Sequence, residues 1–372
     1  MRAGVQGTAV HRGFGHRGTP RIRASLLLTC ARKSLILGYV ASPLAEGKLP
    51  TELLERLLRH TSRSPLLAVG AQPGEDAAVA PGAKTLVITA DPITFTEERI
   101  GAYAVAVNAN DIVAMGGTPV YLTATILLAP GATEEDLERI FLDISDACKK
   151  SGILWVGGHT EVTPVVKRTL VCGQAVGFLS GEPLSTGGAR QGDVICMTKW
   201  VGLEGTTTIA RQLPEESLEV LGSHAFDEVL SWLDIPGISI VEEGRALEGL
   251  ALSSGHDPTE GGVAMGIQEI CRRSAAGAVI RYESLPIREE THQLCRHFGL
   301  DPLGLLSSGV FLFTAPQTVA ELACNELGAR GIPCAQIGEI LPQGDGVWLE
   351  KDGSRQPLRW SEQDEIVKLK RH

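Results

Sequence analysis

The sequence predicts two α/β (α+β) domains, and three observations carry that prediction. At 372 residues, the chain is long enough for two domains of ordinary size. Segments with strand-like and helix-like patterns alternate irregularly along it, as expected of mixed α/β architectures. A stretch rich in Gly, Ser and Pro, residues 181–192, interrupts this alternation and is the expected domain boundary.

The first half of the chain predicts one sheet-forming series. In chain order we expect a helix over 50–60, strands over 77–80 and 85–89, a helix over 98–115, a strand over 120–128, a helix after Thr133, and strands over 153–156 and 169–178. The helix after Thr133 has the clearest signals: Thr133 and Asp136 form a variant of the capping box, and Gly152 ends the helix. Its apolar face is Leu137, Ile140, Phe141, Ile144 and Cys148.

The second half begins another α/β unit with a strand over 193–198. A helix is expected directly after residues 257–262, with Val263, Ile267 and Cys271 on its apolar face. Arg272 and Arg273 suit the carboxyl end of that helix. A strand over 310–314, a helix over 318–329 and the segment IGEI at 337–340 complete the prediction.

Charge is distributed unevenly along the chain. The formal net charge is −10, from 34 basic and 44 acidic side chains. Residues 1–45 hold seven basic side chains and no acidic one, so the rest carries 27 against 44, or −17. A net-acidic body argues against nucleic-acid binding, which depends on neutralising phosphates. We expect residues 1–46 to be a disordered or mis-started extension, with a targeting segment as the alternative.

Two further observations bear on the protein's setting. No apolar run approaches the ~20 residues that span a bilayer, so no membrane association is expected. The eight cysteines include no C-x-x-C pair and no Cys/His group at zinc spacing. A reduced, cytoplasmic protein is therefore expected.

Four aspartates lie beside small residues at the edges of expected elements. They are Asp76, Asp91, Asp111 and Asp257. Carboxylate oxygens are the ligands that Mg²⁺ prefers, usually together with substrate phosphates. Asn108 precedes Asp111 by three residues, so both share one helix face. For each aspartate taken alone, a turn or cap residue is the alternative.

Glycine pairs suggest places where a phosphate could approach the backbone. Gly261 and Gly262 open a helix whose free N–H groups favour an anion. Gly157 and Gly158 precede His159, which could be a metal ligand, a general base or simply a hydrogen-bonded loop residue. The chain contains no P-loop, no Rossmann fingerprint after a strand and no G-x-S-x-G elbow.

An ordered series of short segments resembles the superfamily of aminoimidazole ribonucleotide (AIR) synthetase. Its members include the hydrogenase-maturation protein HypE, thiamine-monophosphate kinase and selenophosphate synthetase. The segments are GKLP at 47–50, GEDAA at 74–78, ITAD at 88–91, NANDIVAMG at 108–116, GGHT at 157–160, GD at 192–193 and DPTEGG at 257–262. The HypE-like branch fits best.

The resemblance implies an N-terminal sheet or half-barrel domain, a C-terminal α/β sandwich domain, and ATP with Mg²⁺ bound between them. It further implies a homodimer whose N-terminal domains share a sheet or barrel. By position, the metal ligands would be Asp76, Asp91, Asp111 and Asp257. The nucleotide contacts would be Asn108, Gly157, Gly158, Thr160, Gly261 and Gly262. The implied chemistry is phosphoryl transfer to an amide or similar oxygen.

Four departures from the HypE pattern matter. His159 stands where a carboxylate is usual, and Glu161 stands where HypE has Lys, so both are the candidate catalytic residues. HypE transfers a carbamoyl group to its own C-terminal Cys and dehydrates that group to a cyano group. The last cysteine here is Cys334. Self-cyanation is therefore not expected. The segment LSSG at 306–309 also lacks the Glu that HypE carries before that Gly.

The expected organisation is an extension over 1–46, an N-terminal domain over 47–182, a C-terminal domain over 183–350 and a tail over 351–372. The expected function is ATP- and Mg²⁺-dependent phosphorylation of an amide-type or phosphate-bearing small substrate, related to hydrogenase maturation. The expected partners are that substrate, a second copy of the chain and a maturation protein. The alternatives are a nucleotide-binding accessory protein without turnover, or a purine- or thiamine-pathway enzyme of the same fold.

Overall fold

The computed structural model describes residues 51–52, 55, 68–69, 72–75, 77–82, 84–94 and 96–371. Residues Gly47–His372 belong to one compact unit. The expected extension over 1–46 and most of the expected helix over 50–60 lie outside the described residues. Within the described residues, no helix is both long and apolar enough to cross a membrane.

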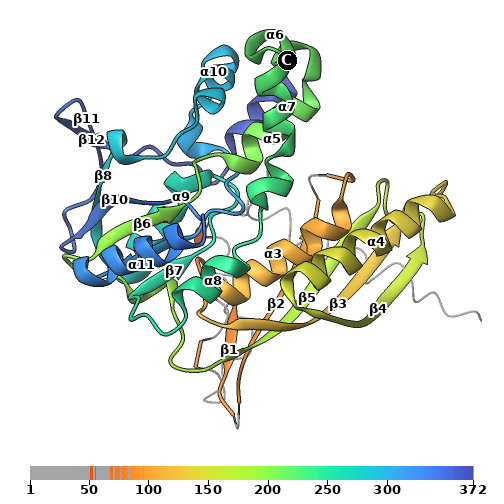
Figure 1. The fold of residues 1–372 in the computed structure, drawn as a ribbon, viewed down its shortest axis with the longest axis horizontal. Helices are drawn as coiled ribbons and strands as arrows, with labels where there is room; N and C mark the ends of the chain where they lie inside the picture. Colours follow the sequence, from red (N-terminus) through yellow and green to blue (C-terminus); the bar gives the residue numbers. More distant parts are fainter. Residues whose placement is uncertain are drawn as a thin grey trace, which may run out of the picture. The chain divides into compact units, whose positions relative to one another are not determined.

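The first sheet has five strands in the order β1-β2-β5-β3-β4 (Figure 1). The bounds are β1 (Ala78–Ala80), β2 (Thr85–Ile93), β3 (Thr118–Leu128), β4 (Leu154–Val162) and β5 (Leu170–Leu179). Neighbouring strands are antiparallel except β3 and β4, which are parallel. Helices α3 (Ile100–Ala114) and α4 (Glu134–Ser151) pack on one face.

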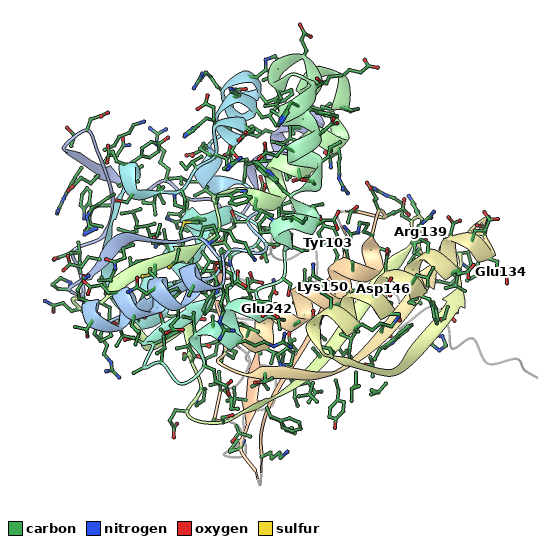
Figure 2. The ribbon with its side chains drawn as sticks, in the orientation of Figure 1. Tyr103, Glu134, Arg139, Asp146, Lys150 and Glu242 are labelled. Carbon is green, nitrogen blue, oxygen red and sulfur yellow. The ribbon has the colours of Figure 1, made fainter. Side chains whose placement is uncertain are left out.

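Helix α4 forms as its sequence predicts. The Thr133 hydroxyl accepts from the Asp136 backbone N–H, and the Asp136 carboxylate accepts from the Thr133 N–H, which completes the capping box. Gly152 ends the helix in the left-handed conformation. The charged side chains Glu134, Arg139, Asp146 and Lys150 are exposed along the helix (Figure 2).

The second sheet has seven strands in the order β12-β11-β8-β10-β6-β9-β7. The bounds are β6 (Val194–Thr198), β7 (Ser254–His256), β8 (Gly277–Arg281), β9 (Leu312–Ala315), β10 (Cys334–Leu341), β11 (Val347–Lys351) and β12 (Ser354–Pro357). Helices α9 (Gly262–Ser274) and α11 (Gln317–Ala329) pack against it. The predicted class, two α/β units that each contain a sheet, is confirmed.

Five further helices were not predicted from the sequence. They are α5 (Leu203–Gln212), α6 (Pro214–Leu221), α7 (Ser223–Ser231), α8 (Val241–Leu247) and α10 (Glu289–Phe298). Four of them, all except α8, pack on one another. Helix α8 instead packs on α3 and α11.

Two predicted strand ends were wrong. Strand β2 continues through Asp91 because Asp91 still pairs with Gly173 of β5. Strand β4 continues through residues 157–161, beyond the expected end at 156, because they pair in parallel with β3. Gly158 is needed there: its φ is +150°, and a Cβ would lie 1.8 Å from the carbonyl oxygen of Ala124.

The stretch 181–192 lies between the last strand of the first sheet and the first strand of the second. The hydrophobic core nevertheless continues past it: Val194 and Phe313 share one buried cluster with Val87 and Ile126. The limits 47–182, 183–350 and 351–372 therefore stay predictions. The last of these segments contains β12 and a 3₁₀ helix, Glu365–Arg371.

Candidate functional site

Two side-chain contacts set the register of α3 against β2. The Thr89 hydroxyl donates to Asp111 Oδ2 at 2.6 Å. Asn108 Oδ1 accepts from the Asp91 backbone N–H at 2.9 Å, and Asn108 Nδ2 donates to the Asp91 carbonyl at 3.2 Å. Residues two apart on a strand, and three apart on a helix, share a face. The two pairs therefore align one face of each element.

Asn108 acts as a clamp on the strand backbone. Its amide also donates to the Ala104 carbonyl at 2.9 Å. The neighbouring strand leaves no room beside it, because a Cβ at Gly173 would lie 2.3 Å from Asn108 Nδ2. Asn108 was predicted to bind nucleotide, whereas its observed contacts position Asp91.

Asn110 connects α3 to the second half of the chain. Its Nδ2 donates to the Ile238 carbonyl at 2.8 Å, and its Oδ1 accepts from the Ile240 N–H at 2.9 Å. The side chain is fully buried, so both contacts are protected from water. The motif at 108–111 thus joins β2 on one side and residues 238–240 on the other.

The aligned residues open onto a cavity of about 560 Å³ lined from both halves of the chain. Three of the four predicted aspartates line it: Asp91, Asp111 and Asp257. Asp76 lies outside the described residues. The acidic side chains at the wall are Glu75, Asp91, Asp111, Glu204, Asp257, Glu260, Glu269 and Glu362, and the arginines are Arg272 and Arg273.

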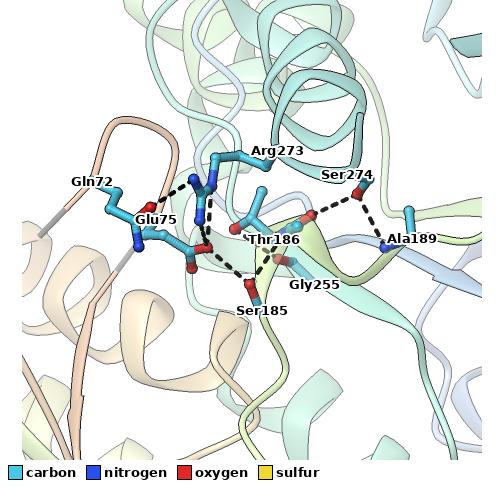
Figure 3. A network of polar contacts seen from close by, with 9 residues as sticks. Gln72, Glu75, Ser185, Thr186, Ala189, Gly255, Arg273 and Ser274 are labelled. Carbon is cyan, nitrogen blue, oxygen red and sulfur yellow. Dashed lines mark hydrogen bonds and ion pairs between the residues drawn. The ribbon is translucent and has the colours of Figure 1, made fainter. Parts of the chain in front are cut away.

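Both arginines of the wall are held by carboxylates (Figure 3 shows Arg273). Arg273 Nη2 lies 2.7 Å from Glu75 Oε1, and Arg273 Nη1 donates to Gln72 at 2.9 Å. Ser185 also donates to Glu75, at 2.8 Å. Arg272 is paired with Glu55 at 2.6 Å. The cavity is therefore strongly negative.

A buried carboxyl group, Glu204, lies at the wall of this cavity. It is carried by α5 and is 6 % exposed. Burial raises the pKa of Glu204 to about 7, opposed by a hydrogen bond from Ser308 and reinforced by the charges of Glu260 and Asp364. Tyr103, on α3, is also hydrogen-bonded to Glu204. The pKa of Tyr103 is raised, mainly by burial and next by the charge of Glu204.

Asp364 closes the amino end of α9. Its Oδ2 accepts from the Gly261 N–H at 2.9 Å, and burial raises the pKa of Asp364 to about 6. The Gly262 N–H donates to Thr259 at 3.1 Å. Gly261 and Gly262 were predicted to bind phosphate; in the structure these N–H groups bind the chain itself. A Cβ at Gly262 would lie 2.5 Å from two carbonyl oxygens.

The remaining predicted residues lie on β4, at the far edge of the first sheet from β1. They are Gly157, Gly158, His159, Thr160 and Glu161, and all five are exposed. His159 Nε2 lies 3.5 Å from Glu161 Oε2. Strands β5 and β3 separate β4 from β2. Within one chain, these residues do not line the acidic cavity.

Glu204, Tyr103 and Asp364 were missed by reasoning from the sequence. Glu204 lies in a Thr-rich segment for which the sequence predicts no helix, and Asp364 lies in the expected tail. A signal was present for Tyr103, which lies five residues before Asn108 on the same expected helix.

The fold and cavity define a two-sheet α/β protein with a carboxylate-rich site between its halves. Residues 74–179 match the family model for the N-terminal domain of AIR synthase related proteins, and residues 190–349 match the model for their C-terminal domain. The chain belongs to the AIR synthase related family.

Three relatives show the range of the similarity. A carbamoyl dehydratase HypE of Rhizobium leguminosarum bv. viciae is 28% identical over 80% of this chain and 84% of its own length. A HypE chain from a HypE–HypF complex superposes with a TM-score of 0.70 at 24% identity, over 83% of this chain and 99% of its own. HypE in complex with ATP superposes with a TM-score of 0.67 at 24% identity, over 87% of this chain and 98% of its own. The chain is an enzyme of this family.

The raised pKa of Glu204 predicts a pH-dependent loss of stability. The folded protein holds this proton up to about pH 7, whereas an unfolded glutamic acid releases it near 4.3. The free energy of unfolding should therefore fall by roughly 3 kcal/mol between pH 4.5 and 8 because of this group. Glu204→Gln should remove that loss.

The measurement is urea unfolding of both proteins across that range, in the presence of a chelator. The expected result is a difference that grows with pH and is level above pH 7. Parallel pH profiles for the two proteins would contradict the burial of a protonated Glu204.

Proposed function

We propose that the chain is an ATP- and Mg²⁺-dependent enzyme that phosphorylates an amide-type or phosphate-bearing small substrate in hydrogenase maturation. One observation carries the proposal: Asp91, Asp111 and Asp257 come from separate elements and line the same acidic cavity. A cavity built in this way suits a metal-bound polyphosphate.

The donor set fits Mg²⁺. Asp111 and Asp257 are buried and Asp91 is half-buried. All three offer carboxylate oxygens, the hard donors that Mg²⁺ prefers. Polyphosphate alone would be repelled, because the wall is acidic and its arginines are already paired. Asp91, Asp111 and Asp257 would hold the ion, which when bound neutralises charge on the transferring phosphoryl group.

Glu204 is proposed to accept a proton during the reaction. A group with a pKa near the working pH exchanges a proton at low cost, and that of Glu204 is about 7. An amide oxygen becomes a better nucleophile as its nitrogen loses a proton. Tyr103 and Ser308 hydrogen-bond to the Glu204 carboxyl group and would orient it.

Similarity to HypE proteins supports the finer parts of the proposal. HypE has been solved with ATP and with HypF, and a related protein is named carbamoyl dehydratase. We therefore propose ATP as the nucleotide, an amide as the substrate class and a second maturation protein as a partner. Self-cyanation is left out, because Cys334 is half-buried beside Cys324 rather than on a mobile segment.

The two candidate catalytic residues lie apart from the cavity. His159 and Glu161 lie on β4 and do not line the cavity within one chain. If these residues act on the nucleotide, a second copy must bring them there.

We also propose that the chain forms a homodimer through the open face of the first sheet. A row of apolar side chains crosses four strands in register: Ile88 pairs with Val176, Val176 with Tyr121, and Tyr121 with Leu154. Ile88, Tyr121 and Leu154 are 44, 39 and 59 % exposed. Helices α3 and α4 cover the other face, so we expect this face to bind the second copy of the chain.

Leu154→Lys should dissociate the dimer, because it would bury an ammonium group against an apolar partner. Sedimentation velocity of the full chain is the measurement, and a shift from dimer to monomer is expected. Leu142→Lys is the matched control, since Leu142 is 55 % exposed on α4. A wild-type monomer, or equal dissociation by both variants, would contradict the proposed interface.

Asp111→Asn should abolish Mg²⁺-dependent ATP turnover while keeping the fold, because the amide has nearly the same shape but no charge. A loss on the order of 100-fold or more in kcat/KM is expected for removal of a direct metal ligand. The assay is ADP formation with and without candidate amides.

Asp227→Asn on the exposed surface of α7 is the control and should keep full activity. Wild-type protein that binds Mg–ATP but never forms ADP would contradict the proposed turnover. Asp111→Asn with wild-type activity would contradict the metal site.

A further inference from the structure

Three cysteines that lie far apart in the sequence meet at the second sheet. Cys196 lies on β6, Cys324 on α11, and Cys334 begins β10. Their three Sγ atoms lie within 4.8 Å of one another, and Cys324 Sγ is 2.7 Å from Cys334 Sγ. None of them lines the acidic cavity.

Strand pairing brings two of the thiols to one face. Strands β6 and β10 are antiparallel, with Cys196 opposite Gln336 and Thr198 opposite Cys334. Cys334 is thus two residues from the partner of Cys196. Diagonal neighbours of this kind lie on the same face of a sheet, within reach of each other.

Helix α11 supplies the third thiol from above that face. It packs on β6, β9 and β10. Its sheet-facing residues Ala320 and Ala323 are small and fully buried, so the helix can approach the strands closely. Cys324 follows directly, beside both strand cysteines.

The trio differs in burial. Cys196 is fully buried, whereas Cys324 and Cys334 are half-buried, which leaves an approach from the surface. Among the described residues, no histidine or carboxylate joins the three sulfurs. The group therefore offers three soft ligands and no hard one.

Cys324 and Cys334 are also in hydrogen-bond contact through their sulfur atoms. Either of these two thiols can be the donor. Thiolates are the form that binds metals, so a cation that binds here displaces the thiol protons.

We infer that Cys196, Cys324 and Cys334 form a binding site for one thiophilic closed-shell cation, Zn²⁺ or Cu⁺. Three converging thiolates are typical of sites selective for such ions. Cu⁺ is satisfied by three sulfurs, and Zn²⁺ would take a water as its fourth ligand. Binding releases the thiol protons to solvent and involves no electron transfer.

Small side-chain movements suffice for binding. With Zn–S bonds of about 2.3 Å, two sulfurs on one ion lie about 3.8 Å apart. The Cys324 and Cys334 sulfurs must therefore separate by about 1 Å, which rotation about their Cα–Cβ bonds allows. The bound ion would connect α11 to β6 and β10.

The test is metal binding by the full chain after reduction with a phosphine and treatment with a chelator. Zn²⁺ is titrated in competition with a chromophoric chelator, and Cu⁺ is titrated with bicinchoninate. One equivalent per chain is expected for at least one of the ions, together with a higher melting temperature. Cys324→Ser and Cys334→Ser should each weaken binding at least about 100-fold.

Cys271→Ser is the matched control, because Cys271 is a buried cysteine of α9 outside the trio. It should bind like wild type. Cys196→Ala tests the buried ligand without placing a hydroxyl in the core, and circular dichroism checks its fold. Binding that survives in all three trio variants would overturn the site. Wild-type protein that binds neither ion would also overturn the site. This holds even if peroxide then converts Cys324 and Cys334 to a disulfide.

Discussion

The register between α3 and β2 is the constraint on which the rest of the site depends. Asn108 binds both backbone groups of Asp91, and Thr89 binds the side chain of Asp111. Slipping either element by one residue would turn one aspartate away from the cavity. Gly173 allows the close approach, and Asn110 extends the same helix to residues 238–240. One helix thus orders both walls.

The gathering of carboxylates has an electrostatic cost. Burial raises the pKa of Glu204 to about 7 and that of Asp364 to about 6. At these two carboxyl groups a bound proton, rather than a neighbouring cation, reduces the negative charge. Asp364 binds the amino end of α9 in place of an external anion. The arginines of the wall stabilise Glu75 and Glu55. The proposed metal ion is then the charge that lets a polyphosphate enter.

Local signals in the sequence predicted elements where they act alone, as at Thr133 and Gly152 of α4. They failed where pairing with a neighbouring strand determines the structure. Gly157 and Gly158 resemble a turn, yet β3 keeps them in a strand, and Asp91 is held in β2 by β5. The Thr-rich α5 is helical because its inner face is buried. Asp91, Asp111 and Asp257 were predicted as site residues from their small neighbours and do line one cavity, whereas the positions of Glu204 and Asp364 depend on long-range folding. The cysteine trio needs the pairing of β6 with β10.

The central claim is that this cavity binds ATP only together with Mg²⁺. Isothermal titration calorimetry with a non-hydrolysable ATP analogue, at constant ionic strength, tests it most directly. With Mg²⁺ we expect one saturable site per chain, and with chelator instead we expect affinity to fall on the order of 100-fold or more. Equal affinity with and without Mg²⁺ would contradict the account.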